Sequence, residues 1–464
     1  MIFLVLATLL AGALAMDRPG AWVIVAAAAI GAYMAMNIGA NDVTNNVGPA
    51  VGSRAMTMGV ALAIAVVFET AGAMIAGGDV VSTISRGIVD PGKMPNAYVF
   101  IWAMMAALLS SAIWVNLATW IGAPVSTTHA VVGGVLGAGV AAAGMSAVDW
   151  SVMGGIAASW VISPVLGGIV AALFLAFIKE FIIYREDKIA SAKRWVPVLV
   201  AIMSGAFASY LAIKGLENVA HLSIGQAFLL GVAIGVCAWL VTRPMIARQA
   251  DGLENKNESL RLLFRVPLIF SAALLSFAHG ANDVSNAIGP LSAIVSVATS
   301  AKIGGVAEIP FWVMMIGACG IAAGILLFGP RLIRLVGEEI TKLNPMRAFC
   351  VALSTAVTVI IASWLGLPVS TTHIAVGGVF GVGFYREWYT RNSKRRMQYI
   401  QMKAAGSEIV RDAPKSSPEE MRRRYLVRRS HFMTIVAAWI ITVPVSALLA
   451  AGIYEILAYL SFQG

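Results

Sequence analysis

The sequence predicts an all-α polytopic membrane protein of about 12–13 transmembrane helices, built from inverted-topology repeats with broken helices or re-entrant hairpins. Hydrophobic residues make up 59% of the 464 residues and charged residues only 12%, whereas soluble domains carry about 25% charged residues. Apolar segments of about 20 residues, long enough to cross a bilayer, recur along nearly the whole chain. Two polar motifs in these segments each occur twice.

The expected spans follow one another with short connections. The first is predicted to be an additional, uncleaved helix, because it lacks the Lys/Arg residues that begin a signal peptide. The second and ninth contain one polar motif each and are predicted to be broken helices. The segments that begin at Pro124 and Pro368 fit either simple crossings or re-entrant hairpins. The spans are 2–16, 20–50, 55–77, 97–121, 123–145, 151–183, 195–214, 222–246, 266–296, 309–330, 346–366, 368–385 and 431–461.

The first duplicated motif covers residues 39–49, Gly-Ala-Asn-Asp-Val-Thr-Asn-Asn-Val-Gly-Pro, and residues 280–290, Gly-Ala-Asn-Asp-Val-Ser-Asn-Ala-Ile-Gly-Pro. Each copy carries an Asp, two or three amides, and a Gly and Pro that disfavour a regular helix. Ionisable side chains inside a bilayer are costly and usually functional. A duplicated polar interruption of apolar helices is typical of the binding site of a transporter.

The second duplicated motif, Pro-Val-Ser-Thr-Thr-His, ends at His129 and again at His373. It follows the first motif at almost the same offset in both parts of the chain, which indicates that an entire half is duplicated. We therefore expect four parts. They are an N-terminal apolar segment, 1–19, a first inverted repeat, 20–184, a linking helix pair with cytoplasmic loops, 185–265, and a second inverted repeat, 266–464, with a basic cytoplasmic loop at 386–430.

An odd number of crossings separates Asp42 from Asp283, so the two halves are predicted to face opposite ways across the membrane. The net charge of +10 is concentrated at 386–429, where 13 Lys and Arg outnumber 5 Asp and Glu. The positive-inside rule places this loop in the cytoplasm, which leaves the C-terminus outside. The charge therefore indicates topology and does not imply a nucleic-acid partner.

The hydroxyl motifs predict an anion site. A helix that begins near His129 exposes unpaired N–H groups and the positive end of its dipole, and neighbouring hydroxyls add neutral donors. Two inverted copies would hold a small oxyanion from opposite sides. Ordinary N-capping by Ser or Thr is the alternative. The candidate ligands are Ser126, Thr127, Thr128, Ser370, Thr371 and Thr372.

The Asp motifs predict a site for a coupling cation. Asp42 and Asn45 share one helix face, as do Asp283 and Asn286, because three residues separate the members of each pair. A carboxylate, an amide oxygen and freed carbonyls suit Na⁺, while an Asp with a raised pKa would instead accept H⁺. Polar contacts between helices are the alternative. Glu69 fits either a coupling-ion role or a structural hydrogen bond, and both histidines of the hydroxyl motifs are interpreted as packing residues.

The doubled Gly-Ala-Asn-Asp-Val-x-Asn-x-x-Gly and Pro-Val-Ser-Thr-Thr-His motifs resemble the inorganic phosphate transporter (PiT) family of ion-coupled symporters. Phe68-Glu69-Thr70 resembles its first half as well. The resemblance implies about twelve helices in inverted repeats, an assembly that is often a homodimer, and phosphate moved with Na⁺ or H⁺. It assigns the six hydroxyl residues to phosphate and Asp42, Asn45, Asp283 and Asn286 to the cation. Asn46, at a position that is small in many members, and the N-terminal segment depart from the family pattern.

The leading hypothesis is a secondary active symporter of the cell membrane that imports inorganic phosphate with Na⁺ or H⁺, without catalytic residues or a resident cofactor. Its expected partners are phosphate, the coupling cation and the lipid bilayer. Sulfate, thiosulfate or a metal–phosphate complex are alternative substrates. An intramembrane aspartyl protease would use Asp42 and Asp283, but such an enzyme needs one catalytic pair and no hydroxyl clusters. An anion channel is disfavoured, because two buried carboxylates repel an anion unless a cation accompanies it.

Overall fold

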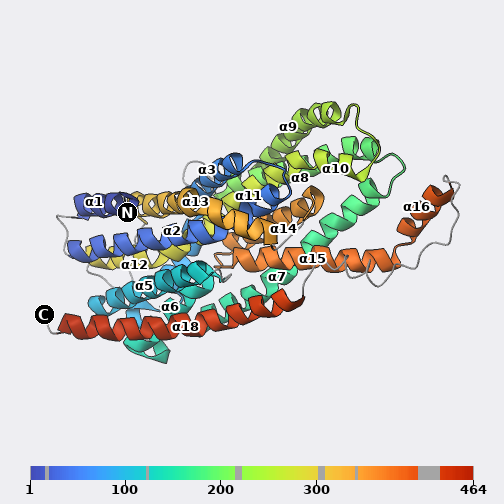
Figure 1. Ribbon diagram of the computed structural model, residues 1–464. Helices are drawn as coiled ribbons and strands as arrows, with labels where there is room; N and C mark the ends of the chain where they lie inside the picture. The colour runs from blue at the N-terminus through green and yellow to red at the C-terminus, as the bar shows by residue number, and fades with distance from the viewer. Residues whose placement is uncertain are drawn as a thin grey trace.

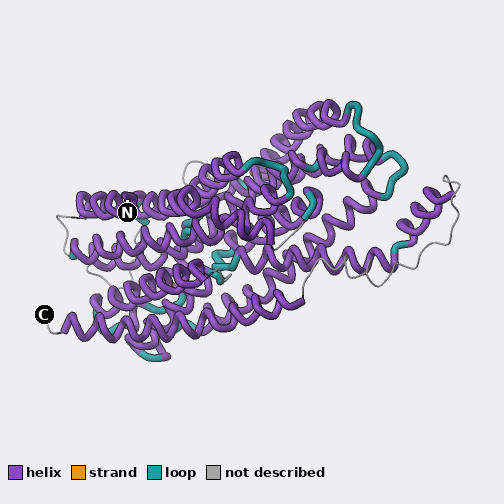
Figure 2. Tube along the Cα trace, viewed as in Figure 1, coloured by secondary structure: helices purple, strands orange, loops and turns teal. Residues whose placement is uncertain are grey.

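The computed structural model describes residues 2–15, 20–121, 125–214, 222–300, 309–339, 343–405 and 429–462, and these residues form helices without a strand (Figures 1 and 2). Nine of the described helices are long and apolar enough to cross a membrane, or ten when a pair bent by 44° counts as one span. The predicted all-α polytopic membrane fold is therefore confirmed.

The helices divide along the chain into a first half, a linking pair and a second half. The first half contains α1 (Ile2–Ala15), α2 (Ala21–Gly52), α3 (Met58–Ala76), α4 (Gly78–Ser82), η1 (Thr83–Gly87), η2 (Pro91–Lys93), α5 (Ala97–Ile121), α6 (Thr127–Ala143), η3 (Met145–Ala147), α7 (Trp150–Ile178) and η4 (Lys179–Ile183). The linking segment contains α8 (Lys188–Lys214), α9 (Ile224–Ala250) and α10 (Asn257–Leu263). The second half contains α11 (Arg265–Asp283), α12 (Ser285–Ser300), α13 (Phe311–Glu339), α14 (Pro345–Trp364), α15 (Thr371–Asn392), α16 (Lys394–Ala405) and α18 (Arg429–Phe462).

The two halves pack by exchanging helices. Helix α2 lies against α13 and α3 lies against α11, and these two contacts are equivalent by the order of the helices along each half. Helix α6 likewise packs on α18, and α15 packs on α7. Each of these helices therefore buries a face against the opposite half, which is how the inverted repeat appears in the packing.

The hydroxyl motifs lie at the tips of two re-entrant hairpins. Helices α5 and α6 form one hairpin on the side of the C-terminus, and α14 and α15 form the other on the opposite side (Figure 1). Short loop segments lie in the middle of the bundle where the described parts of the tips meet (Figure 2). Pro124 is outside the described residues. A re-entrant hairpin begins and ends on the same side of the membrane, and so does a pair of complete crossings. The number of crossings between Asp42 and Asp283 therefore stays odd, and the predicted opposite orientation of the halves is unchanged.

The break that we expected in the first Asp motif is absent, and this prediction was wrong. Helix α2 continues from Ala21 to Gly52 through the whole motif, including Pro49. In the second copy only Val284 interrupts the helical run, between α11 and α12. A break is not needed to expose a backbone carbonyl as a ligand. Proline has no N–H, so the carbonyl four residues before it in the helix has no hydrogen-bond donor. Pro49 thereby frees the carbonyl of Asn45.

The first glycine of each Asp motif lies at a close approach between helices. A Cβ atom on Gly39 would lie 2.1 Å from the Ile321 carbonyl oxygen of α13, and one on Gly280 would lie 2.1 Å from the Glu69 carbonyl oxygen of α3. The atoms that the added Cβ would meet belong to a helix backbone, which cannot move aside as the end of a flexible side chain can. The motif therefore needs glycine here because two helix backbones touch.

We expect Gly280→Ala to destabilise the fold by about 1–3 kcal/mol, the usual cost of forcing extra volume into a packed interior. Gly48→Ala is the matched control, since a Cβ there meets nothing within 4 Å. Thermal unfolding of both variants in the same detergent measures the difference. Equal unfolding temperatures for Gly280→Ala and the parent protein would contradict the close approach.

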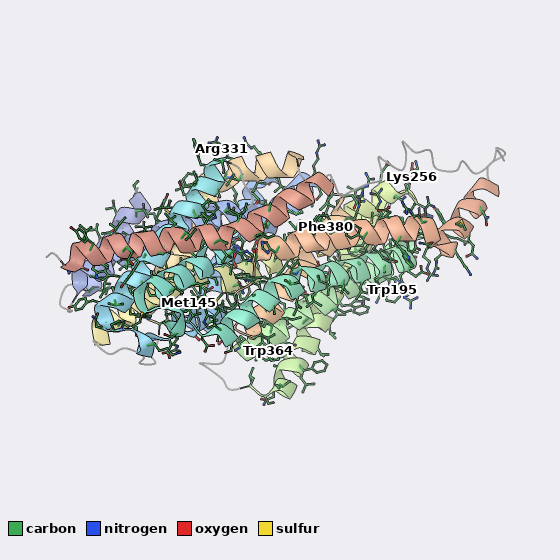
Figure 3. The ribbon with its side chains drawn as sticks, turned by 90° about the horizontal axis from the view of Figure 1, so that it is seen from below. Met145, Trp195, Lys256, Arg331, Trp364 and Phe380 are labelled. Atoms are coloured by element: carbon green, nitrogen blue, oxygen red, sulfur yellow. The ribbon has the colours of Figure 1, made fainter. Side chains whose placement is uncertain are left out.

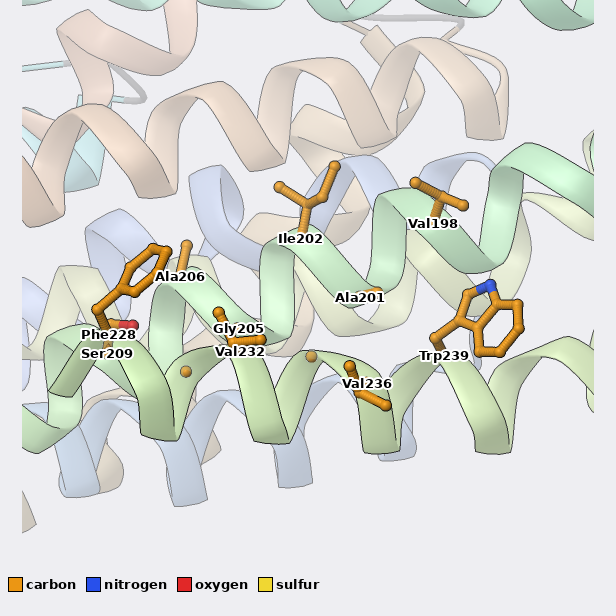
Figure 4. A pocket seen from close by; sticks show the side chains of 12 residues that line it. Val198, Ala201, Ile202, Gly205, Ala206, Ser209, Phe228, Val232, Val236 and Trp239 are labelled. Atoms are coloured by element: carbon orange, nitrogen blue, oxygen red, sulfur yellow. The ribbon is translucent and has the colours of Figure 1, made fainter. Parts of the chain in front are cut away.

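The linking helices α8 and α9 pack tightly against each other and border an apolar groove of about 700 Å³ (Figure 4). Valine, isoleucine, alanine, glycine and aromatic residues line it, with Ser209 as its single hydroxyl, and no charged side chain faces it. The groove has the character of a lipid-facing surface. It does not have the polar groups that an ion or phosphate site needs.

That the basic loop faces the cytoplasm and the C-terminus faces the outside remains a prediction. Part of that loop (406–428) and Gly464 lie outside the described residues. Exposed positions at the two ends allow a test: Ser146 lies in the same short connection as Met145, and Glu254 lies close to Lys256 (Figure 3). In a background without Cys237, Cys319 and Cys350, an impermeant thiol reagent should label Ser146→Cys in intact cells and leave Glu254→Cys unlabelled. The reverse pattern would invert the assignment, and labelling of both would reject it.

Candidate functional site

The four motif copies converge on one buried polar site. Asp42 on α2 accepts a hydrogen bond from the Thr127 hydroxyl at the start of α6, over 3.0 Å. Asp283 on α11 accepts the equivalent bond from Thr371 at the start of α15, over 3.3 Å. Both aspartates are 1% exposed. Within each half, the carboxylate motif is therefore fastened to the hydroxyl motif of the same half.

The amides of the motifs connect one half to the other. Asn45 donates to the Thr372 hydroxyl over 2.8 Å, and Asn286 donates to the Thr128 hydroxyl over 3.2 Å. Thr372 also donates to Asp42 over 3.4 Å. Asn286 also donates to the Thr127 hydroxyl over 3.4 Å, so Asp42, both amides and three of the threonines belong to one network that neither half forms alone. Asp283 and Thr371 form a separate pair beside it.

The helix starts supply backbone donors at the same place. Ser126 and Ser370 are N-caps, and their hydroxyl oxygens accept the N–H groups of His129 and His373 over 3.2 and 3.3 Å. The capping role that we treated as an alternative is therefore present for both serines. The N–H groups of the motif threonines begin these helices and have no acceptor within them, and unpaired N–H groups at a helix start are the kind of donor that an anion accepts.

Asn282 holds a hairpin tip in position. Its amide nitrogen donates to the Ser363 hydroxyl over 3.0 Å and to the Leu367 carbonyl over 3.2 Å, and its oxygen accepts the Val369 N–H over 3.3 Å. Its counterpart Asn41 donates to the Thr119 hydroxyl over 2.9 Å. These two amides position the loops that carry the hydroxyls.

The two motif histidines pack against each other where the halves meet. Their rings are edge to face with centroids 4.4 Å apart, and the His129 ring lies 3.9 Å from that of Trp160. The Trp160 indole N–H donates to the Pro368 carbonyl over 3.2 Å. This arrangement agrees with the packing role expected for His129 and His373.

His279 is a site residue that the sequence reasoning missed. Its Nδ1 lies 2.9 Å from a Glu69 carboxylate oxygen, and its Nε2 lies 3.1 Å from Asp283 and 3.7 Å from Asp42. Glu69 also accepts a hydrogen bond from the Asn46 amide over 2.8 Å. His279 precedes Asp283 by four residues and so shares its helix face, a signal that could have identified it.

The site has an excess of buried negative charge. Asp42, Asp283 and Glu69 are all at most 1% exposed, and His279 is their ion-pair partner in the described part of the chain. Three carboxylates and one imidazole leave a formal charge of at least −2 when all three are ionised. Burying uncompensated charge is costly, so the geometry favours a bound cation.

Several oxygen atoms of the Asp motifs have no hydrogen-bond partner among the described residues and could therefore bind a cation. Asp283 Oδ1, Asn286 Oδ1 and Asn46 Oδ1 are buried without a hydrogen-bond partner in the structure described. The Asn286 carbonyl is also freed from its helix hydrogen bond, because Pro290 follows it by four residues within α12. Carboxylate, amide and carbonyl oxygens are ligands for hard cations. One oxygen of each aspartate and a His279 nitrogen lie within 4.8 Å of one another, but Glu69 already engages the other imidazole nitrogen.

Comparison with known proteins agrees with this site. A family model described as the phosphate transporter family matches residues 38–450. The chain belongs to this family. The resemblance noted in the sequence is thereby confirmed, and the membrane helices place this family member in the cell membrane as a multi-pass transporter of phosphate. It is not an enzyme, so the aspartyl protease hypothesis is set aside.

Named relatives extend over nearly the full length of this family member. A protein of Helicobacter pylori strain J99 named "Putative phosphate permease" is 46% identical, over 99% of this chain and 94% of the relative. A Pyrococcus abyssi protein with the same designation is 37% identical, over 92% of this chain and 96% of its own. A solved structure named "The sodium-dependent phosphate transporter" matches with a TM-score of 0.81 and 32% identity, covering 94% of this chain and 99% of that chain.

Proposed function

We propose that this phosphate transporter is a secondary active symporter that imports inorganic phosphate together with Na⁺. One observation carries the proposal: the threonine hydroxyls that would bind phosphate donate to the carboxylates that would bind the cation. Thr127 donates to Asp42 and Thr371 donates to Asp283. The hydroxyl protons that phosphate would accept are therefore held by the carboxylates until a cation takes the place of the hydroxyl.

This shared use of hydroxyls provides a physical basis for coupling. A hydroxyl has one proton to donate, so Thr127 donates either to Asp42 or to a phosphate oxygen. A cation on the carboxylate replaces the hydroxyl as its partner and leaves that proton for the anion. The same exchange applies to Thr371 and Asp283. Each ligand thus makes the site more favourable for the other, as reciprocal linkage requires.

The cation ligands in this proposal are Asp42 and Asn45 from the first half and Asp283 and Asn286 from the second. The partnerless oxygens of Asp283 and Asn286 support this assignment. The relative named as sodium-dependent supports Na⁺ as the ion. Cations would also offset the repulsion between the carboxylates and the phosphate, which no Lys or Arg ion pair relieves among the described contacts of Asp42 and Asp283.

The phosphate ligands in this proposal are the six hydroxyl residues at the hairpin tips, together with the N–H groups that begin α6 and α15. The tips approach from opposite sides and meet through Thr128, whose hydroxyl donates to the Val369 carbonyl over 3.0 Å. Phosphate keeps a proton at neutral pH that it can donate to an aspartate, whereas sulfate has none. This difference favours phosphate over sulfate or thiosulfate.

Uptake of labelled phosphate into proteoliposomes tests the function, with Na⁺ and pH gradients imposed separately. We expect a Na⁺ gradient alone to drive accumulation, and excess sulfate to leave it unchanged. Passive equilibration without accumulation would indicate a channel. Inhibition by sulfate, or uptake that requires a divalent metal, would favour the other substrates that we considered.

His279 separates Na⁺ coupling from H⁺ coupling. The imidazole contacts Glu69 and Asp283 and partly compensates their charge, so His279→Gln leaves more negative charge available to a cation. The Na⁺ concentration for half-maximal uptake should therefore stay the same or fall, while a pH gradient alone drives no uptake in either protein. If a pH gradient drives the parent protein and His279→Gln loses that uptake, the imidazole carries the coupling proton and Na⁺ coupling is wrong.

Two further points remain proposals. One is the homodimer implied by the family resemblance, and the other is the division of the chain into parts at 1–19, 20–184, 185–265 and 266–464. The apolar outer faces of α8 and α9 belong to the linking part, which has no counterpart in the repeat. Native mass spectrometry of the purified protein would measure the number of chains. A single chain at all concentrations would reject the dimer.

A further inference from the structure

A buried lysine lies far from the transport site, at the junction of α7 and η4. Lys179 is 6% exposed, and its ammonium lies 4.3 Å from the ring centroid of Tyr389 and 5.3 Å from that of Tyr385. No carboxylate among the described residues lies within 4.0 Å of its Nζ. Cation–π contacts return about 2 kcal/mol, whereas burying an ion costs several kcal/mol. The charge is therefore incompletely compensated.

Three arginines from other helices add to this positive charge. Arg386 of α15 lies between Tyr385 and Tyr389, whose rings contact the Lys179 ammonium. Arg396 of α16 follows Arg395, which pairs with the Glu180 next to Lys179, and Arg347 belongs to α14, a helix that packs on both α7 and α15. We call these four residues the α7–α15 cation cluster: Lys179, Arg347, Arg386 and Arg396.

The carboxylates beside the cluster are bound to other arginines. Glu180 pairs with Arg395 and accepts a hydrogen bond from the Tyr389 hydroxyl over 3.2 Å, and Glu387 pairs with Arg391 over 2.7 Å. Neither carboxylate therefore neutralises Lys179. The Tyr184 ring stacks on that of Tyr389 with centroids 5.5 Å apart, which fixes the aromatic wall next to the ammonium.

We propose that the α7–α15 cation cluster is a second anion site, which binds a phosphate-bearing anion at the end of the molecule predicted to face the cytoplasm. Arginine side chains bind phosphate oxygens through paired N–H groups, and lysine adds a point charge. A phosphate group would compensate the buried Lys179 ammonium and accept hydrogen bonds from the neighbouring guanidinium groups. The group belongs either to a soluble anion or to an anionic lipid headgroup, which offer the same chemistry.

This site is separate from the transport site. Arg386 lies 15 residues beyond Thr371 on the same helix, which corresponds to about 22 Å at 1.5 Å per residue. Both sites nevertheless involve α15, and the cluster also includes the end of α7, its packing partner from the other half. An anion in the cluster would hold these two helices together.

The test uses the full chain in nanodiscs. One arm measures binding of inorganic pyrophosphate by calorimetry in discs of phosphatidylcholine, and the other measures, by native mass spectrometry, retention of phosphatidylglycerol relative to phosphatidylcholine. The variants are Lys179→Met and Arg396→Gln in the cluster, Arg248→Gln as an exposed arginine on α9, and Thr371→Val in the transport site. Unfolding temperatures without a probe are recorded for each.

We expect Lys179→Met and Arg396→Gln to weaken one of the two probes at least tenfold, while Arg248→Gln and Thr371→Val keep it. The arm that responds identifies the source as a soluble anion or a lipid. Without a probe, Lys179→Met should unfold at the same temperature as the parent protein or higher, because an uncompensated charge is removed. Failure of both probes to bind, an equal loss in Arg248→Gln, or loss in Thr371→Val with retention in Lys179→Met would each overturn the proposal.

Discussion

Asp283→Asn should abolish Na⁺-driven phosphate accumulation while leaving the protein folded, and Asp42→Asn should do the same. Asparagine preserves the shape of the side chain and still accepts the hydrogen bond from Thr371 or Thr127. It removes the charge that a cation would neutralise, and losing one partner of a buried ion pair costs about 3 kcal/mol or more. That cost corresponds to a loss of at least about a hundredfold in cation affinity. Initial rates of labelled uptake under a Na⁺ gradient provide the measurement.

Asp251→Asn is the control, because this exposed carboxylate pairs with Lys193 over 3.2 Å outside the site, and its loss should leave Na⁺-driven uptake unchanged. Unfolding temperatures show that each variant is folded before its transport is compared. Near-normal Na⁺-dependent uptake by a folded Asp283→Asn protein would eliminate that carboxylate as a cation ligand. Loss in only one of the two Asp variants would show that the inverted copies have different roles.

The second large effect should come from the hydroxyls. Thr127→Val and Thr371→Val keep the side-chain volume and delete the donor that is shared between carboxylate and phosphate. Each lost hydrogen bond to a charged group costs about 1.5–3 kcal/mol, which weakens phosphate about tenfold to a hundredfold. Because the same proton serves both ligands, the cooperativity between Na⁺ and phosphate should fall as well. Phosphate binding isotherms at several Na⁺ concentrations measure both quantities.

Thr242→Val is a suitable control, since its hydroxyl donates only to the Ala238 carbonyl within α9. Thr127→Ser should restore binding because it returns the donor. A weakened phosphate affinity with an unchanged dependence on Na⁺ would mean that the hydroxyl binds the anion without linking it to the cation. Effects confined to Thr371→Val would reject a symmetric two-sided site.

The sequence was sufficient to predict the duplicated site because its signals are local. Asp42 with Asn45 and Asp283 with Asn286 share helix faces by spacing alone, and the hydroxyl motifs coincide with helix starts. It was not sufficient to predict that Asn45 would reach Thr372, since 327 residues separate them. Such contacts depend on how the two halves pack together, and the spacing of residues along the sequence does not reveal that packing.

Other differences have similarly specific causes. The presence of Pro49 suggested a broken helix, but a proline near the end of a long helix removes one hydrogen bond and allows the helix to continue. His279 escaped notice because the first half has Ile38 at the equivalent position. A search for duplicated residues overlooks a group that occurs once.

The exchange of helices between halves also constrains how the protein is made. The hydroxyl of Thr127 follows Asp42 by 85 residues and that of Thr372 follows it by 330. At about 5–20 residues per second, a ribosome needs roughly 4–17 s to supply the first and 17–66 s to supply the second. During that interval the early carboxylate can rely on Thr127 alone, so its bond within the first half protects an acidic membrane helix until the rest of the chain arrives.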